Sequence, residues 1–250
     1  MKKELALMAV VAGLPMGVQA DTLFGVYAGA SMWSQAYSGG IEFANQGEID
    51  MENDLGFDEE DATYLYIAIE HMVPMVPNIK LQRTEMSTDA NSTLSRNITF
   101  EGQVFSAAQD ISSTLDLSHT DATFYYEVLD NWVSLDLGMS IRVFDGEVSV
   151  VSADGSLQAD QSISAPLPML YGKVQFDLPF SGFSLGAEAN YLMVSGNGVS
   201  DILLRAAYES PYRVGAELGY RTFTFKLDDI DDLYGELTVE GPYLAVTLHL

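Results

Sequence analysis

The chain has 250 residues, of which 36 are acidic and 11 are basic, so its formal net charge at pH 7 is −25. This acidic excess opposes binding to nucleic acid, which needs clustered Lys and Arg side chains. Cysteine is absent, which excludes disulfides, thiol nucleophiles and thiolate metal sites.

Residues 1–20 have the features of a secretory signal peptide. Lys2 and Lys3 precede an apolar run over 5–18, and the segment ends in the small residues that a signal peptidase recognises. The run is too short and too interrupted by glycine and proline for a membrane-spanning helix, which needs about 20 apolar residues. We therefore exclude residues 1–20 from the fold and predict one domain over 21–250.

The remaining chain is a succession of segments in which apolar and polar side chains alternate. In the segment that starts at Tyr212, for example, Val214, Leu218 and Tyr220 alternate with polar residues such as Glu217. A period of two places the two sets on opposite faces of a strand. This pattern predicts strands at about 23–33, 62–73, 78–87, 118–128, 132–144, 166–178, 183–194, 200–209 and 212–226, and a last strand that ends at residue 250.

The predicted connections alternate between short and long. Short turns follow the second, fourth, sixth and eighth strands, whereas 35–61, 88–117 and 145–164 are predicted as long polar loops, with a hairpin at 98–105. The connection at 196–198 is short as well. Aromatic residues on the apolar face gather near the short turns, namely Tyr126, Phe176, Phe183, Tyr208 and Tyr212. Both features are typical of bacterial outer-membrane barrels.

We therefore predict an all-β fold, a closed antiparallel transmembrane β-barrel of about ten strands, with eight or twelve as alternatives. Closure pairs every backbone donor and acceptor, which an open sheet in lipid cannot do. The competing interpretation is a secreted lipocalin-like or sandwich protein, which buries its apolar face and exposes its polar one.

The C-terminal strand alternates Leu244, Val246, Leu248 and Leu250 up to the terminal carboxylate. It resembles the assembly signal of outer-membrane proteins, with leucine in place of the usual terminal aromatic residue. Over 21–250 the chain resembles outer-membrane β-barrel proteins of Gram-negative bacteria. More narrowly, it resembles an uncharacterised gammaproteobacterial outer-membrane family with a glycine pair early in the first loop, here at 39–40.

The resemblance implies a location in the outer membrane with both termini in the periplasm, and it implies no activity. The expected partners are outer-membrane lipid, lipopolysaccharide and, through the C-terminal strand, the barrel-assembly machinery. We expect a monomer.

Charged residues of both signs fall on the polar face of the predicted strands, which would line the lumen. They are Glu70, Lys80, Asp121, Glu127, Asp136, Arg142, Lys173, Asp177, Glu188, Arg205, Arg213, Glu217 and Arg221. Because a ten-stranded barrel has a narrow interior, we predict ion pairs that plug it. The alternative is a narrow, charge-lined pore for small solutes.

The sequence contains one weak candidate for catalysis. His119 and Asp121 lie two residues apart and share a strand face, as a general base and the group that orients it must do. Placed at the outer rim, they would support a hydrolase. We favour a non-enzymatic structural or surface protein, because the adjacent Ser118, the hydroxyl that could complete a triad with them, points to the opposite face of the strand.

Two acidic segments are weak candidates for a metal site. The first holds Asp50, Glu52, Asp54 and Asp58, and the second holds Asp228, Asp229, Asp231 and Asp232. Their carboxylates suit Ca²⁺ or Mg²⁺, but the glycine of the first segment is one position later than in a calcium-binding loop. We expect a solvated acidic rim and no cofactor, with a bound divalent cation as the alternative.

Overall fold

The computed structural model describes residues 24–43, 47–164, 166–230 and 233–250, and its regular elements are β-strands. Among these residues no helix is long and apolar enough to cross a membrane. The predicted signal peptide, residues 1–20, lies outside them. Ten strands form one wall: β1 (Phe24–Phe43), β3 (Glu60–His71), β4 (Asn78–Thr84), β9 (His119–Asp130), β10 (Val133–Phe144), β13 (Pro166–Asp177), β14 (Phe183–Val194), β15 (Asn197–Glu209), β16 (Val214–Ile230) and β17 (Leu233–His249).

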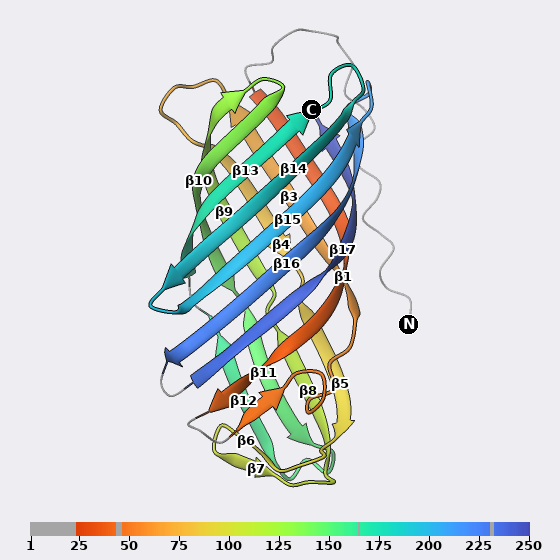
Figure 1. Cartoon of the computed structure of the whole chain (residues 1–250), viewed down its shortest axis with the longest axis vertical. Coiled ribbons are helices and arrows are strands. Elements are labelled where there is room, and N and C mark those ends of the chain that lie inside the picture. The colour runs from red at the N-terminus through yellow and green to blue at the C-terminus, as the bar shows by residue number, and fades with distance from the viewer. Residues whose placement is uncertain (1–23, 44–46, 165, 231–232) are drawn as a thin grey trace.

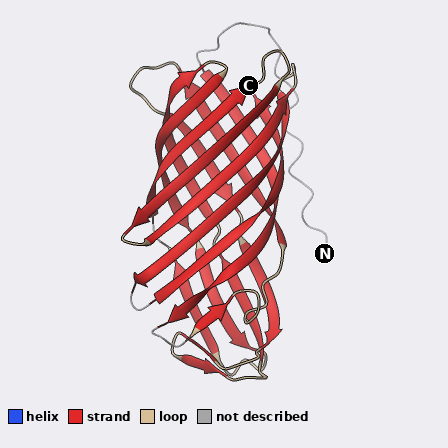
Figure 2. Ribbon diagram, viewed as in Figure 1, coloured by secondary structure: helices blue, strands red, loops and turns tan. Residues whose placement is uncertain are grey.

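The wall is a closed antiparallel barrel, as predicted. Its strands follow the order β17-β16-β15-β14-β13-β10-β9-β4-β3-β1, and pairing of β17 with β1 closes the ring (Figure 1). This last pairing runs from Tyr27 opposite His249 to Phe43 opposite Leu233. The predicted count of ten strands is therefore confirmed, and the strands cross the molecule at a common tilt (Figure 2).

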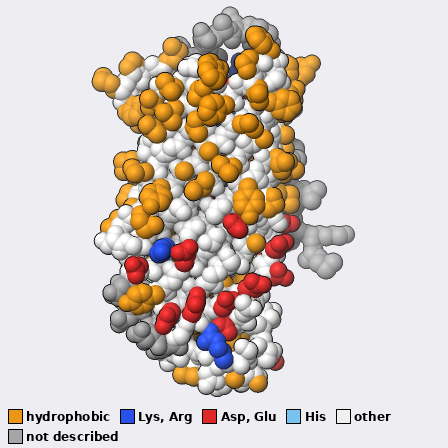
Figure 3. Space-filling view, in the orientation of Figure 1, with side chains coloured by type: hydrophobic (Ala, Val, Ile, Leu, Met, Phe, Trp, Pro, Cys, Tyr) orange, Lys and Arg blue, Asp and Glu red, His pale blue; other side chains and the backbone are white. Residues whose placement is uncertain are grey.

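The apolar face of the barrel points outward. Leu218, Leu204 and Leu137 are 61%, 56% and 47% exposed. On the face drawn in Figure 3, hydrophobic side chains cover most of the half nearer the C-terminus, whereas Asp and Glu side chains gather over the other half. Such an apolar belt on a closed barrel is the surface that meets lipid, so the predicted orientation of the two faces is confirmed.

The belt predicts a position-dependent cost for an outward charge. In Leu218→Lys an ammonium group would replace an exposed side chain within the belt, and we expect the unfolding free energy to fall by about 2–4 kcal/mol. Urea titration of protein folded into phospholipid vesicles measures this change. The matched control is Ser38→Lys, also outward and exposed but beyond the belt on β1, where we expect little change. Equal losses at the two positions would contradict the assignment of the belt to lipid.

Beyond the belt, four wall strands continue into a smaller sheet. After short breaks, β4, β9, β10 and β13 extend as β5 (Ser87–Thr93), β8 (Asp110–Asp116), β11 (Gly146–Ser152) and β12 (Gln158–Ile163). These four pair in the order β12-β11-β8-β5. We call them the outer sheet, and we call the half of the molecule beyond the belt the outer half. A hairpin of β6 (Ile98–Phe100) and β7 (Gln103–Phe105) stands at the same end, which confirms the hairpin predicted at 98–105.

Several predicted loops are strands instead. Residues 35–61 are not one loop, because β1 continues to Phe43, β2 (Glu48–Asp50) pairs with it, and β3 begins at Glu60. Residues 145–164 contain β11 and β12, and 88–117 contain most of β5 and β8. The physical reason is that the outward side of these strands carries polar side chains instead of the apolar side chains of the belt. Strands that face water alternate buried Ile111 and Leu115 with exposed polar residues, so their apolar content resembles that of a loop.

The glycine pair at 39–40 has a structural role in β1. Gly39 has a φ of 98° and lies opposite Leu237 of β17. A Cβ atom at this position would lie 2.0 Å from the carbonyl oxygen of Glu236. Only glycine accommodates both the left-handed backbone and the close approach of the neighbouring strand. Gly39 therefore lets β1 and β17 approach closely at this point of the wall.

The turn between β11 and β12 is organised by Asp154. Its Oδ1 accepts a hydrogen bond from the Ser156 backbone N–H at 3.0 Å and from the hydroxyls of Ser156 and Ser152 at 2.7 Å each. These bonds favour the ionised carboxyl and lower the pKa of Asp154 to about 2. The turn thus keeps its charge and its geometry in mildly acidic solution.

Candidate functional site

A buried cluster of charges lies across the lumen. Asp121 on β9 and Arg142 on β10 are direct neighbours in the wall. The Arg142 guanidinium donates through Nε and Nη2 to the two oxygens of Asp121, at 2.8 and 2.7 Å, and through Nη2 to Asp201 Oδ2 on β15 at 2.6 Å. From β16, Arg221 donates to both oxygens of Asp201 at 2.8 and 2.7 Å. All four side chains are at most 1% exposed.

This network joins opposite parts of the wall. β10 and β15 are separated by β13 and β14 in the sheet order, so the Arg142–Asp201 contact spans the interior rather than following the wall. Arg221 also contacts β4, where its Nη1 donates to the Thr84 hydroxyl at 3.2 Å. Two arginines and two aspartates balance in formal charge, which is the condition under which buried ions are tolerated. The cluster therefore links strands across the lumen and blocks the lumen at this level.

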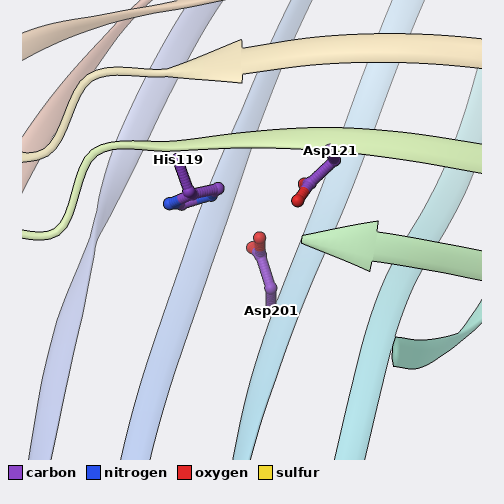
Figure 4. A group of neighbouring side chains, drawn as sticks. All are labelled: His119, Asp121 and Asp201. Carbon is purple, nitrogen blue, oxygen red and sulfur yellow. The ribbon is translucent and has the colours of Figure 1, made fainter. Parts of the chain in front are cut away.

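His119 lies beside the cluster without an ion pair. Its Nδ1 is 2.8 Å from the carbonyl oxygen of Leu117, so this nitrogen carries the proton that is donated. Its ring stacks on Phe223 with centroids 5.9 Å apart. The other nitrogen, Nε2, has no hydrogen-bond partner among the described residues. In Figure 4, His119 and Asp121 project from the same strand, and Asp201 faces Asp121 from β15.

The three side chains in Figure 4 bring potential ligand atoms within 4.8 Å of one another. The surrounding charges do not suit a metal ion, however. Each oxygen of Asp121 and Asp201 already accepts a guanidinium hydrogen bond. A divalent cation would have to displace these bonds and then sit beside two arginines, which Coulomb repulsion strongly opposes. The donor set fits an ion-pair cluster better than a metal centre.

The predicted rim position of His119 and Asp121 is wrong, because the two side chains are 0% and 1% exposed. The neighbouring Ser118 is buried too, and its hydroxyl accepts a hydrogen bond from the Met86 N–H at 3.0 Å. β9 begins at His119, but the outer sheet extends the enclosed space well beyond that point. The strand end is therefore inside the molecule rather than at its surface.

Sequence reasoning omitted Asp201 from the set of lumen ion pairs, although this residue joins the two arginines. Its signal was the same alternation that placed Arg205 inward. The alternation of β15 shows only that Asp201 points into the lumen. It does not show its partners, which come from β10 and β16. Which inward charges meet across a barrel depends on strand register and tilt.

An apolar core lies on the outer side of this cluster. It includes Phe144 and Phe223 next to the charges, and Leu55, Phe57, Met86, Leu94, Phe100, Phe105, Ile111 and Leu115 from the outer strands and their connections. These residues are at most 2% exposed. The outer half is thus packed like a soluble β-protein. The lumen is blocked at two successive levels, by the charge cluster and by this apolar core.

The other predicted lumen charges lie between the cluster and the short turns. Three further ion pairs form there: Lys80–Glu188 at 2.5 Å, Lys173–Asp136 at 2.9 Å and Arg205–Glu217 at 3.1 Å. Glu70 accepts a hydrogen bond from the Tyr125 hydroxyl, Glu127 from the Asn78 amide, and Asp177 from the Gln175 amide.

Arg213 does not belong to this set. The prediction that it faces the lumen is wrong, because Arg213 lies exposed in the turn before β16 with a φ of 62°. The alternation of the strand begins one residue later, at Val214.

The first acidic segment uses its carboxylates to hold its own loop. Asp50 Oδ1 accepts hydrogen bonds from the backbone N–H groups of Glu52 and Asn53 at 3.0 and 2.7 Å. Buried Asp54 pairs with Arg96, whose guanidinium also reaches the carbonyl oxygen of Glu48.

Among the described residues, the remaining metal candidates do not form a group of ligand atoms. Asp58 accepts a hydrogen bond from the Glu59 N–H at 2.8 Å, and Glu52 is exposed. In the second segment, Asp228 and Asp229 lie in β16. Asp228 is exposed, and no Lys or Arg of the described residues pairs with its carboxylate. Asp231 and Asp232 lie outside the described residues.

The Arg96 contacts predict that one side chain holds the 51–57 segment in place. Arg96→Ala removes the only Lys or Arg that pairs with Asp54 in the described part of the chain. We expect amide hydrogen exchange in 51–57 to accelerate about tenfold or more, since local opening no longer breaks a partly buried ion pair. Arg83→Ala is the control, because its pair with Glu85 is exposed on both sides. Unchanged protection in Arg96→Ala would contradict this role.

No protein-family model matches this chain, and no curated protein sequence matches it. Among solved structures, the outer-membrane protease OmpT from Escherichia coli is similar with a TM-score of 0.53 and 10% sequence identity, over 93% of this chain and 99% of that one. The P. putida toluene transporter TodX scores 0.36 at 9% identity, with 92% and 91% covered. Ail, the attachment invasion locus protein of Yersinia pestis, scores 0.37 at 11% identity, with 90% and 99% covered. The similarity to OmpT is one of fold, so the chain has the fold of an outer-membrane β-barrel.

Proposed function

We propose that this protein is an integral outer-membrane barrel with a closed lumen, which acts at the cell surface as a non-enzymatic structural or adhesive protein. Its termini and short turns lie in the periplasm, and its four-stranded sheet stands outside the cell. The long and short connections at opposite ends support this orientation. In this proposal it is a monomer that contacts outer-membrane lipid and lipopolysaccharide, and the assembly machinery reads its last strand.

The observation that carries the proposal is the double closure of the lumen. The side chains of the charge cluster are at most 1% exposed, and the apolar core covers them on the outer side. Ions and polar solutes need a continuous hydrated path, which buried paired charges and packed aliphatic side chains do not offer. This arrangement favours a plugged barrel over the narrow pore.

The outer half has the properties of a display platform. Its sheet of β5, β8, β11 and β12 contains no Lys or Arg among its described residues, and its exposed side chains are mostly Ser, Thr, Asp, Asn and Gln. A packed core beneath this polar face keeps it rigid above the membrane. Rigid polar sheets suit contacts with other surface molecules, because little conformational entropy is lost on binding.

Planar-bilayer recording tests the closure. We expect purified, folded protein to insert without conductance steps under conditions in which a sixteen-stranded porin conducts. Folding is verified beforehand by the shift in electrophoretic mobility between unheated and heated samples. Reproducible steps from folded wild-type protein would overturn the closed-lumen proposal and favour the narrow pore.

A hydrolase centred on His119 and Asp121 is the second candidate. The Nε2 of His119, which has no hydrogen-bond partner in the described part of the chain, favours it, and the burial of both side chains weighs against it. If the protein turns over lipids or peptides at this site, His119→Ala abolishes that turnover while the protein stays folded. Our proposal expects wild type and variant to be equally inactive.

A further inference from the structure

The lumen contains a blind cavity between the charge cluster and the short turns. Its volume is about 560 Å³, and residues of the β13–β14 turn, including Phe180 and Gly182, lie at its mouth. It does not reach the outer half, because the charge cluster and the apolar core lie beyond it. A cavity of this size falls in the range of small-molecule sites.

The lining has an excess of carboxylates. Among the described residues that line it, the Lys and Arg side chains are Lys80, Lys173 and Arg205, and they pair with Glu188, Asp136 and Glu217. Five more acids line the same space without a Lys or Arg partner in the described part of the chain: Glu70, Glu127, Asp130, Asp177 and Glu209. Several negative groups around a confined space with low-dielectric walls concentrate cations inside it.

The walls between these carboxylates are aromatic. Tyr27 stacks on His249 with ring centroids 4.2 Å apart, and Tyr125 packs against Tyr171 at 5.6 Å. Lys80 Nζ lies 5.1 Å from the centroid of the Tyr66 ring, so one ring of the cavity already receives an ammonium group. Tyrosine faces attract ammonium ions and also cover methylene groups.

The spacing of the carboxylates argues against a metal ion. Within the described residues, the one group of three His, Asp or Glu ligand atoms within 4.8 Å is the buried His119, Asp121 and Asp201. The cavity acids form no such group, so they do not converge as the oxygen ligands of Ca²⁺ or Mg²⁺ must. Separated carboxylates suit separated positive charges on one ligand.

We propose that this cavity binds a linear polyamine. Its ammonium groups would pair with separated acids, including Glu70 and Glu127, and the methylene spacers would lie on the tyrosine rings. The inference does not depend on the surface role proposed above, since it concerns the opposite end of the barrel.

Isothermal titration calorimetry of the full chain, folded in non-ionic detergent at about 0.1 M salt, tests the proposal with spermidine as the probe. We expect one saturable site for spermidine and much weaker binding of butylamine, which has a single ammonium group. In Glu70→Gln/Glu127→Gln we expect about a tenfold or greater loss of affinity, because two charge contacts disappear. Asp89→Asn/Asp160→Asn removes the same charge from exposed positions of the outer sheet and should bind spermidine like the wild type.

Three results would overturn the proposal: no saturable binding to the wild type, equal losses in the two double variants, or complete displacement of spermidine by Mg²⁺ at equal charge concentration. The last two indicate screening of the acidic protein as a whole. If Glu70→Gln/Glu127→Gln does not fold, Asp130→Asn/Asp177→Asn replaces it. These two residues are exposed at the strand ends, and the same weakening is expected there.

Discussion

Asp201→Asn is expected to lower the unfolding free energy by about 3–5 kcal/mol. Asp201 accepts hydrogen bonds from two guanidinium groups in a site with 0% exposure. The isosteric amide keeps the volume but removes the charge, which leaves Arg142 and Arg221 with one aspartate between them. An uncompensated charge in a buried site is far more costly than the loss of an exposed ion pair. Urea titration of the vesicle-folded protein, followed by electrophoretic mobility, measures the change.

Asp89→Asn is the control for this substitution. Asp89 is an exposed acid on β5 whose carboxylate accepts one hydrogen bond, from the Thr114 hydroxyl at 2.6 Å. We expect its replacement to cost about 1 kcal/mol or less. A similarly small loss for Asp201→Asn would mean that water reaches the cluster and solvates the arginines. That outcome would count against the closed lumen as well.

Gly138→Ala is expected to destabilise the barrel by about 2 kcal/mol or more. Gly138 on β10 lies opposite Tyr125 of β9. A Cβ atom at this position would lie 2.0 Å from the carbonyl oxygen of Phe124 and 2.7 Å from the Tyr125 Cα. Both atoms belong to the backbone, so no side-chain rotation relieves the overlap and the two strands must separate locally.

The neighbouring strand offers a matched control, Gly172→Ala on β13. The added Cβ would meet only the Leu137 side chain, at 3.7 Å, which is ordinary van der Waals contact. The two substitutions are the same, and both sit within the barrel wall, so the unfolding free energies of the two variants are directly comparable. We expect Gly172→Ala to lie within about 0.5 kcal/mol of the wild type. Equal effects at the two positions would contradict the close approach of β9 and β10.

The predictability of the wall follows from the two solvents that it separates. Residues such as Leu218 face lipid and residues such as Glu217 face the lumen, so the alternation has high contrast and marks β16 in the sequence. The outer strands lack the exposed apolar residues that form the belt. There, Ser, Thr and Asp alternate with a few buried residues such as Ile111 and Leu115, and the contrast is too low to distinguish β8 or β11 from a polar loop.

The candidate site was less predictable than the wall for a geometric reason. The sequence placed His119 and Asp121 on one face of a strand, and the structure keeps them there (Figure 4). It does not bring them to the rim, because the extension of the wall beyond β9 encloses them. Asp201 and Arg221 are about 80 residues or more away from them in the chain, and only closure of the ring brings all four charges of the cluster together.

What the sequence alone determined is the class of the molecule: a ten-stranded barrel with an apolar outer face, a charged lumen, and short turns at one end with longer connections at the other. A period of two is a local property of each strand, so it survives without knowledge of any neighbour. The tertiary structure decided whether the inside is open. Register across the β17–β1 seam and the tilt of the wall choose which charges meet, and packing of the outer strands places an apolar core over them. Register, tilt and packing are not local properties of one strand, because they depend on contacts between residues far apart in the chain.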